Sequence, residues 1–219
     1  GDWRCPVVMR VPVGGYIHGS LCHSQSIEGY FTHLPGIRIA YPSNAADAKG
    51  LLKSACRMDD PILFLEHKGL YRQGYASSNE PSEKYLLEFG KANIIQQGDD
   101  ITIVTWGALV QKSIEASKNT SFSVEIIDMR TLNPLDFECI IKSIKKTSRL
   151  IVAHEDNLTG GFGAEIVSRI SDFAFEYLDA PVKRVASKDS PIAYAQNLED
   201  EILVQVDWII DCINEVGNY

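Results

Sequence analysis

The sequence has 219 residues, 45% of them apolar, and a formal net charge of −8 without any run rich in lysine or arginine, which disfavours binding to the phosphate backbone of nucleic acids. It contains no stretch of about 18 apolar residues and no visible secretory signal, so no segment is expected to span a membrane. Five scattered cysteines without a CxxC pair predict reduced thiols, as in the cytoplasm of a bacterium or in the mitochondrial matrix.

The first third of the sequence combines three predicted strands with one helix. The strands are expected at residues 7–13, 37–41 and 62–65. A glycine-rich loop, residues 14–19, follows the first strand. Between the second and third strands, apolar residues recur at helical spacing after Ser43 and Asn44, either of which can cap a helix. That helix is expected to stop before Pro61.

The next segment differs in composition, because glycine, serine, asparagine and proline replace most aliphatic residues, and we interpret residues 67–86 as a linker. Beyond it, strands and helices alternate to the end of the chain. Strands are expected at residues 101–106, 123–128, 150–153 and 182–185, and helices at residues 108–117, 136–146, 163–177 and 201–214. This alternation predicts an α/β fold with a mostly parallel sheet, helices on both of its faces and ligands beyond the carboxyl ends of its strands.

Polar residues gather directly after the glycine-rich loop, in the run Cys22-His23-Ser24-Gln25-Ser26. An imidazole can donate or accept a proton near neutral pH, which makes His23 a candidate catalytic residue. Gln25 and the two serines are suited to fixing its tautomer or to binding a carboxylate. A loop histidine that bonds only to backbone groups is the alternative, and the residues by themselves leave both interpretations open.

Glycines also follow the predicted strand that ends at His154-Glu155, in the run TGGFG at residues 159–163. Glycines at such a position let the amino end of a helix approach an anion, but this run matches neither GxGxxG nor a P-loop. Tight packing of the helix on the strand is therefore the favoured interpretation. His154 is expected either at an interface or within the packed layer. Residues 131–136 are interpreted as a turn and a helix cap, and Trp3, Trp106 and Trp208 as core residues.

Several blocks in this order resemble the beta subunit of the decarboxylase component of 2-oxo acid dehydrogenase complexes, a relative of transketolase. The blocks are HSQS at residues 23–26, AKGLL at 48–52, DPILFLE at 60–66 with LYR at 70–72, IIDMRTLNPLD at 126–136, and HEDNLTGGFGAEI at 154–166. The resemblance implies the last part of a pyrimidine-binding domain at residues 1–66, the linker at 67–86 and a complete transketolase C-terminal domain at 87–219. Since the sequence runs almost directly into its first strand, we expect more of the first domain to precede it in the parent protein.

The resemblance also implies chemistry. The family uses thiamine diphosphate and Mg²⁺ to decarboxylate a 2-oxo acid, and it acylates the lipoyl group of an acyltransferase component. By this likeness His23 would hold the substrate carboxylate or move protons during acyl transfer, with Ser24 and Gln25 in support. The family's cofactor-activating glutamate would lie upstream of this sequence, and the alpha half would bind the diphosphate and Mg²⁺, so this chain would supply one wall of the site.

Two details bear on the substrate. Ser26 and the ending Leu70-Tyr71-Arg72 resemble the branched-chain type, which favours acids such as 3-methyl-2-oxobutanoate over pyruvate, the alternative substrate. The family usually has an aromatic residue before the catalytic histidine, whereas this sequence has Cys22.

The resemblance further implies a metal site and partners. Some family members bind a potassium ion through backbone carbonyls, and carbonyl oxygen suits such a hard cation. The matching positions are Cys5, Val7, Ala55, Met58 and Asp60. The expected partners are the alpha half, as a separate subunit or fused in one polypeptide, and the acyltransferase component, in a homodimer or an α2β2 assembly. We expect the chain by itself to be inactive, serving then only as a dimerisation and acyltransferase-docking module. A sugar-transferring transketolase is disfavoured by the HSQS block.

Overall fold

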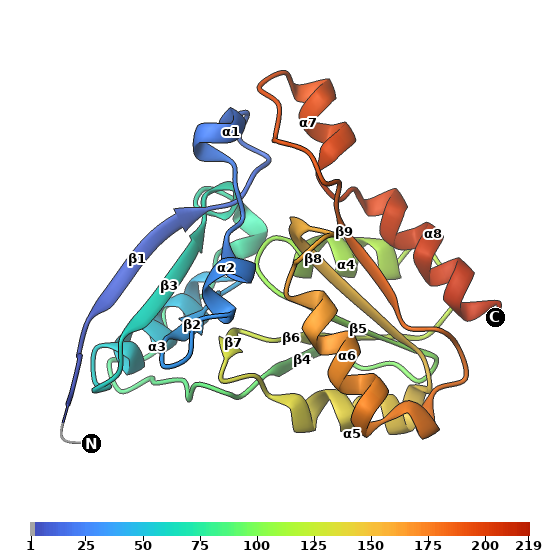
Figure 1. The fold of residues 1–219 in the computed structure, drawn as a ribbon, viewed down its shortest axis with the longest axis horizontal. Helices are drawn as coiled ribbons and strands as arrows, with labels where there is room; N and C mark the ends of the chain where they lie inside the picture. The colour runs from blue at the N-terminus through green and yellow to red at the C-terminus, as the bar shows by residue number, and fades with distance from the viewer. Residues whose placement is uncertain (1–2) are drawn as a thin grey trace.

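Two β-sheets form the framework of the protein in the computed structural model, which describes residues 3–219. Figure 1 shows the two sheets side by side, with the amino-terminal half of the chain around one and the carboxyl-terminal half around the other. The first sheet has the order β1-β3-β2-β7 and the second the order β4-β6-β5-β8-β9. The α/β class with mostly parallel sheets is therefore confirmed.

The first sheet is parallel except at one edge. Its strands are β1 (Val8–Val13), β2 (Arg38–Ala40), β3 (Ile62–His67) and β7 (Thr131–Asn133), of which β7 runs antiparallel to β2. The helices of this half are α1 (Ser20–His23), α2 (Glu28–Thr32) and α3 (Ala45–Ala55), followed by 3₁₀ turns η1 (Lys68–Leu70) and η2 (Gly74–Ala76).

Helix α3 forms as predicted, with Asn44 as its cap. The Asn44 side chain accepts a hydrogen bond from the backbone N–H of Asp47, which satisfies one of the free donors of the first turn. Leu51 and Ala55 are spaced by one helical turn, and both are buried against the sheet residue Phe64. The apolar face of α3 thus covers one side of the first sheet.

The second sheet carries helices on its faces. Its strands are β4 (Asn93–Gln96), β5 (Ile101–Thr105), β6 (Val124–Asp128), β8 (Leu150–Asn157) and β9 (Lys183–Ser187). Its helices are α4 (Leu109–Ser117), α5 (Phe137–Thr147), α6 (Gly163–Phe173), α7 (Gln196–Ile202) and α8 (Val206–Gly217), with a 3₁₀ turn η3 (Phe175–Tyr177). Only β4 is antiparallel to its neighbour. Every residue of the central strand β5 is buried, as expected for a parallel strand covered on both faces.

The single closing helix predicted at residues 201–214 is wrong. The chain instead forms α7 and α8, and the backbone between them is extended at Leu203 and Gln205. Leu203 and Val204 are completely buried, so tertiary packing of these two side chains overrides the helical propensity of the segment. Residues 131–133, interpreted as part of a turn, form β7, because β2 offers a pairing partner about ninety residues earlier in the chain.

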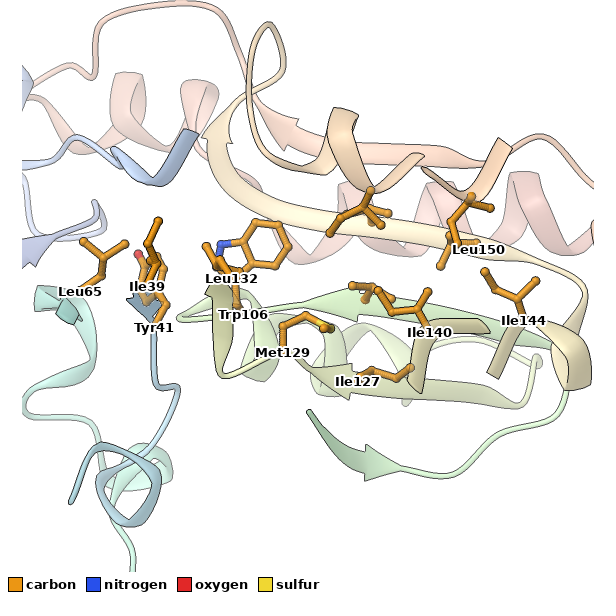
Figure 2. Packing of buried hydrophobic residues seen from close by; sticks show 14 of the residues in the cluster. Ile39, Tyr41, Leu65, Trp106, Ile127, Met129, Leu132, Ile140, Ile144 and Leu150 are labelled. Carbon is orange, nitrogen blue, oxygen red and sulfur yellow. The ribbon is translucent and has the colours of Figure 1, made fainter. Parts of the chain in front are cut away.

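One hydrophobic core runs through both sheets. Figure 2 shows Leu65, Ile39 and Tyr41 of the first half beside Leu132, Trp106 and Met129 of the second half, and all of these belong to one buried cluster. Strand β7 comes from the second half yet completes the first sheet. The two halves are consequently packed as one unit, and polar groups buried at their junction, such as Glu155 and His67, are shielded from water. Among residues 3–219, no helix combines the length and the apolar character needed to cross a membrane.

Candidate functional site

His23 lies at the surface, at the end of the four-residue helix α1. Its backbone carbonyl accepts a hydrogen bond from the ammonium group of Lys68, while its ring forms no hydrogen bond within residues 3–219. Ser24 is completely buried, and its Oγ accepts from the backbone N–H of Gly19 at 3.0 Å. Gln25 is half-buried and accepts the N–H of Gly14 at 3.1 Å through its backbone carbonyl. Ser24 and Gln25 therefore close the loop on itself and leave the His23 ring free.

The loop before His23 has a strained backbone. Tyr16, His18 and Ser20 have φ angles of 59°, 57° and 57°, in the left-handed region that non-glycine residues avoid. Each such residue costs about 1–3 kcal/mol and persists only where surrounding contacts hold it. The Tyr16 hydroxyl donates to the carbonyl of Val204 at 2.8 Å, and His18 binds Glu199. The shape of this loop is thus imposed by the carboxyl-terminal half of the molecule.

A buried carboxylate joins the two halves. Oε2 of Glu155 in β8 lies 2.6 Å from Nε2 of His67 at the end of β3, and both side chains are almost fully buried. Oε1 of Glu155 accepts from the N–H of Gly15 at 2.6 Å and from the hydroxyl of Ser26 at 3.2 Å. One carboxylate therefore holds the chain on both flanks of His23. We call Gly15, Ser26, His67 and Glu155 the junction cluster.

The ring proton of His67 can be placed from its hydrogen bonds. Gly69 N–H donates to Nδ1 of His67 at 3.1 Å, so Nδ1 acts as an acceptor, and the ring proton lies on Nε2, facing Glu155. Burial by itself would raise the pKa of Glu155, but its contacts with His67, Gly15 and Ser26 favour the charged form and hold the pKa below its usual value. Glu155 is thus a stable buried anion.

The position of the junction cluster follows from the topology. His67 is the last residue of β3, Gly15 lies two residues beyond the end of β1, and Glu155 is near the end of β8. These are carboxyl ends of parallel strands, the place where the alternating pattern predicts a ligand site. The sequence pattern missed His67 because it was assigned to the linker, whereas strand β3 extends through it. The sequence pattern indicated Glu155 only as one of two polar residues, His154 and Glu155, at the end of a predicted strand.

A second buried cluster lies on the other side of α2. The indole N–H of Trp106 donates to Oε1 of Glu28 at 2.9 Å, and the Trp106 ring stacks on His154 with the ring centroids 5.5 Å apart. Burial, together with the nearby charge of Asp156, raises the pKa of Glu28 to about 8. Burial lowers the pKa of His154 to about 4, so this ring is neutral at pH 7. The sequence prediction that Trp106 is a core residue is confirmed, and Trp208 is half-buried, but the prediction is wrong for Trp3, which precedes β1 and is 97% exposed.

This cluster predicts a pH dependence of stability. The pKa of Glu28 rises from its ordinary value of 4.5 to about 8 on folding, so its contribution is complete below pH 4.5 and is lost as the pH rises through about 8. We expect Glu28→Gln, which keeps an acceptor for Trp106, to flatten the fall of stability over this window, by at most about 1.4 kcal/mol per pH unit. Urea unfolding followed by tryptophan fluorescence at pH 5.5, 6.5, 7.5 and 8.5 measures it. Equal slopes in both proteins would contradict the prediction.

The glycine run at residues 159–163 packs against His154 rather than forming an open loop. A Cβ at Gly163 would lie 2.5 Å from the His154 ring, and one at Gly161 would lie 2.3 Å from the carbonyl of Asn157. We expect Gly163→Ala to lower the free energy of unfolding by about 1–3 kcal/mol, because the buried ring cannot move away. Gly74→Ala is the control, since nothing lies within 4 Å of a Cβ there. Equal urea midpoints for the two variants would show that the ring can shift.

The residues that resemble the branched-chain type lie on opposite faces of the first sheet. Ser26 bonds to Glu155 in the junction cluster, whereas the Tyr71 hydroxyl donates to Glu66 at 2.6 Å, beside the Arg10–Glu66 ion pair. Because Glu66 and His67 are consecutive in β3, their side chains point to opposite faces. Ser26 is therefore linked through Glu155 to one residue at the end of β3, and Tyr71 directly to another.

The carbonyl groups predicted to bind potassium lie in one region, where the segment before β1 runs beside the end of α3. They belong to Cys5, Val7, Ala55, Met58 and Asp60. Ile62 N–H donates to the Val7 carbonyl at 2.8 Å, Val7 N–H to that of Cys5 at 2.8 Å, and Met58 N–H to that of Ala55 at 3.1 Å. A carbonyl oxygen has two lone pairs, so these hydrogen bonds do not by themselves prevent the carbonyls from binding a cation, and the potassium site stays a prediction.

The chain by itself does not fit the diphosphate and Mg²⁺. Within the part that the structure describes, no three or more histidine, cysteine, aspartate or glutamate side chains converge in a way that could hold a metal ion. The neighbouring buried carboxylates of Glu28, Glu155 and Asp156 each accept internal hydrogen bonds, although Oε2 of Glu28 has no partner among the described residues. No catalytic step through the cofactor is therefore assigned to residues of this chain.

Comparison with known proteins places these features in a family. The sequence matches the transketolase C-terminal domain over residues 90–209 and the transketolase pyrimidine binding domain over residues 1–73. A solved structure described as a split gene transketolase, an inactive beta4 tetramer, has a TM-score of 0.77 to this chain at 21% identity, covers 98% of it and is itself covered to 67%. This likeness supports the fold.

Relatives found by sequence identity indicate the family more specifically than the fold does. The chain is 40% identical over 222 residues to the 2-oxoisovalerate dehydrogenase subunit beta of Bacillus subtilis (strain 168), covering 100% of this chain and 67% of the relative. It is 42% identical to the pyruvate dehydrogenase E1 component subunit beta of the same organism, covering 90% and 61%. It is 40% identical to the subunit of that name from Staphylococcus aureus, covering 90% and 62%. The chain spans about two thirds of the length of these relatives, and it belongs to the family of 2-oxo acid dehydrogenase beta subunits.

Proposed function

We propose that this chain is the beta half of a thiamine-diphosphate-dependent 2-oxo acid dehydrogenase. With an alpha half it would decarboxylate a branched-chain 2-oxo acid and acylate the lipoyl group of an acyltransferase component. The observation that carries this proposal is the 40% identity to the 2-oxoisovalerate dehydrogenase subunit beta over the whole chain. The placement of the His23 segment beyond the carboxyl ends of parallel strands agrees with it, because ligands bind there in such sheets.

In this proposal His23 is the catalytic residue of the chain. Its exposed ring, which forms no hydrogen bond within the described residues, is available to a substrate carboxylate or to a lipoyl sulfur. Ser24 and Gln25 support it by closing the loop through the N–H groups of Gly19 and Gly14. Thiamine diphosphate supplies the electronic chemistry when bound, and the protein supplies position and proton transfer.

The partners follow from the same proposal. The diphosphate and Mg²⁺ would be held mainly by the alpha half, as a separate subunit or fused in one polypeptide, in a homodimer or an α2β2 assembly with the acyltransferase component as acceptor. The potassium site at the carbonyls beside α3 stays a prediction. The location of the protein in the cytoplasm or the mitochondrial matrix also stays a prediction. The division at residues 66 and 86 also stays a prediction.

The substrate is tested with the chain in its full-length parent enzyme, supplied with the alpha half, thiamine diphosphate and Mg²⁺. We expect a higher kcat/KM for 3-methyl-2-oxobutanoate than for pyruvate in a side-by-side decarboxylation assay. A preference for pyruvate would retain the family and refute the branched-chain assignment, and the 42% identity to a pyruvate dehydrogenase subunit makes pyruvate the second candidate. Lack of turnover with both would refute the proposed function. The isolated chain is expected to show no turnover.

A further inference from the structure

Helix α7 and the carboxyl-terminal segment that follows it hold the loop before His23 at three points, Glu199, Leu203 and Val204. A Cβ at Gly15 would lie 2.4 Å from Cδ1 of Leu203, so the loop backbone is packed directly on this buried side chain. The Tyr16 hydroxyl donates to the Val204 carbonyl at 2.8 Å. His18 binds Glu199, which lies at the same end of the molecule. Figure 1 shows α1 and α7 projecting together at that end, although they are far apart in the sequence.

Glu199 is the polar anchor of this contact. Its side chain is completely buried, and its carboxylate accepts the backbone N–H of His18 at 3.1 and 3.3 Å. The same carboxylate lies 2.9 Å from Nδ1 of His18, whose side chain is 46% exposed. The backbone of Glu199 is fixed inside α7, because Leu203 N–H donates to its carbonyl at 2.9 Å. A rigid, buried carboxylate therefore binds both the backbone N–H and the side chain of His18.

The backbone conformation of the loop shows why contacts with Glu199 are needed. Glycine adopts positive φ without steric cost, yet this loop has Tyr16, His18 and Ser20 at φ angles of 57–59°. Two of these side chains, Tyr16 and His18, bind the carboxyl-terminal segment. The strained positions thus coincide with the residues that the other half of the molecule holds, which is the pattern expected where strain positions a functional group.

We propose that Glu199 is a positioning residue of the active site: by holding His18 in its left-handed conformation, it sets the direction in which α1 presents His23. Only four residues separate His18 from His23, and the hydrogen bond from Gly19 N–H to Ser24 closes the chain around them. A change in the His18 backbone is therefore transmitted to His23 with little room for adjustment. This inference rests on the proposed function.

The test uses the full-length enzyme with its alpha half, thiamine diphosphate and Mg²⁺. Glu199→Ala is expected to lower kcat for lipoyl acylation roughly ten- to a hundredfold, the effect of a small displacement of a catalytic group. Glu199→Gln, which keeps an acceptor for the His18 N–H, should restore most of this loss. Glu201→Ala is the matched control, because Glu201 lies on the same helix but its side chain binds, among residues 3–219, only the exposed Lys188.

A double-mutant cycle shows whether Glu199 acts through His23. If it does, Glu199→Ala should cost less than about twofold in an enzyme that already carries His23→Ala, since there is then no imidazole to misplace. If the fold loss of the double variant equals the product of the losses of the two single variants, the proposal is overturned, because Glu199 would then act by another route. If Glu199→Ala does not assemble, the same cycle is run with Glu199→Gln, whose smaller loss must also vanish in the His23→Ala background.

Hydrogen exchange separates this proposal from the proposed function. Glu199→Ala should speed the amide exchange of residues 16–20 in the assembled enzyme without changing that of β5, whatever substrate the enzyme prefers. Unchanged exchange in that loop, with turnover also unchanged, would overturn the role of Glu199. If His23→Ala leaves turnover intact while the loop exchange responds to Glu199→Ala, the catalytic assignment of His23 fails; Glu199 still holds the loop, but its role in positioning a catalytic group falls with that assignment.

Discussion

Replacing Glu155 with alanine is expected to lower the free energy of unfolding by about 3–5 kcal/mol, because it leaves three buried hydrogen-bond donors without an acceptor, at about 1–3 kcal/mol each. The ring N–H of His67, the backbone N–H of Gly15 and the hydroxyl of Ser26 would all lose their acceptor. Since the cluster joins β1, β3 and β8, the loss should affect both halves together. Urea unfolding followed by circular dichroism measures the change.

The control and the second variant isolate the charge. Glu176→Ala removes an exposed glutamate with no ion pair among the described residues, and its effect should stay within about 0.5 kcal/mol. Glu155→Gln keeps the side-chain volume and one acceptor, so its loss should be intermediate. Combining Glu155→Ala with His67→Ala should cost less than the sum of the two single changes, because the residues contact each other. A Glu155→Ala value as small as that of the control would refute the role of the junction cluster.

Replacing His23 with alanine is expected to reduce lipoyl acylation by about 10²–10⁴-fold, the usual contribution of a general acid or base. The ring is exposed and makes no hydrogen bond within residues 3–219, so folding and assembly should be unaffected. The rate of acylation of a lipoyl domain, measured in the full-length enzyme, gives the loss, and thermal unfolding of the same preparation checks stability.

The matched control for this change is His33→Ala, since His33 is also exposed and lies at the end of a short helix in the same half of the chain. We expect less than about threefold loss for it, because it has no part in the proposed site. Equal losses for the two histidines would show that the region responds to any substitution. A His23→Ala enzyme with full acylation activity would remove His23 from the mechanism while leaving the family membership intact.

The parts of the fold that local patterns decide were predictable. Helix α3 has a capping asparagine and a periodic apolar face, and β5 is a run of apolar and β-branched residues, so each segment carries its own signal. The parts that were missed depend on distant partners. Strand β7 has three residues and exists because β2 pairs with it. The break between α7 and α8 exists because Leu203 and Val204 are buried under the amino-terminal half of the protein and the second sheet.

The candidate site divides in the same way. The polar run around His23 is contiguous in sequence, so it was visible as a cluster and as part of a family resemblance. Glu155, Glu199 and His67 support that run from positions far away in the sequence, and no periodicity links them to it. Ser24 illustrates the limit of the pattern, because its hydroxyl is expected to fix the imidazole tautomer or bind a carboxylate, whereas in the structure it accepts a backbone hydrogen bond that closes the loop.

The sequence by itself determined the α/β class, the alternation of the second half and the family, because these depend on short-range periodicity and on ordered motifs. Only the tertiary structure decided which residues hold the His23 loop. Buried polar groups must find partners wherever the fold brings them together, so the glycine-rich loop takes its shape from Glu155 and Glu199, more than a hundred residues further along the chain.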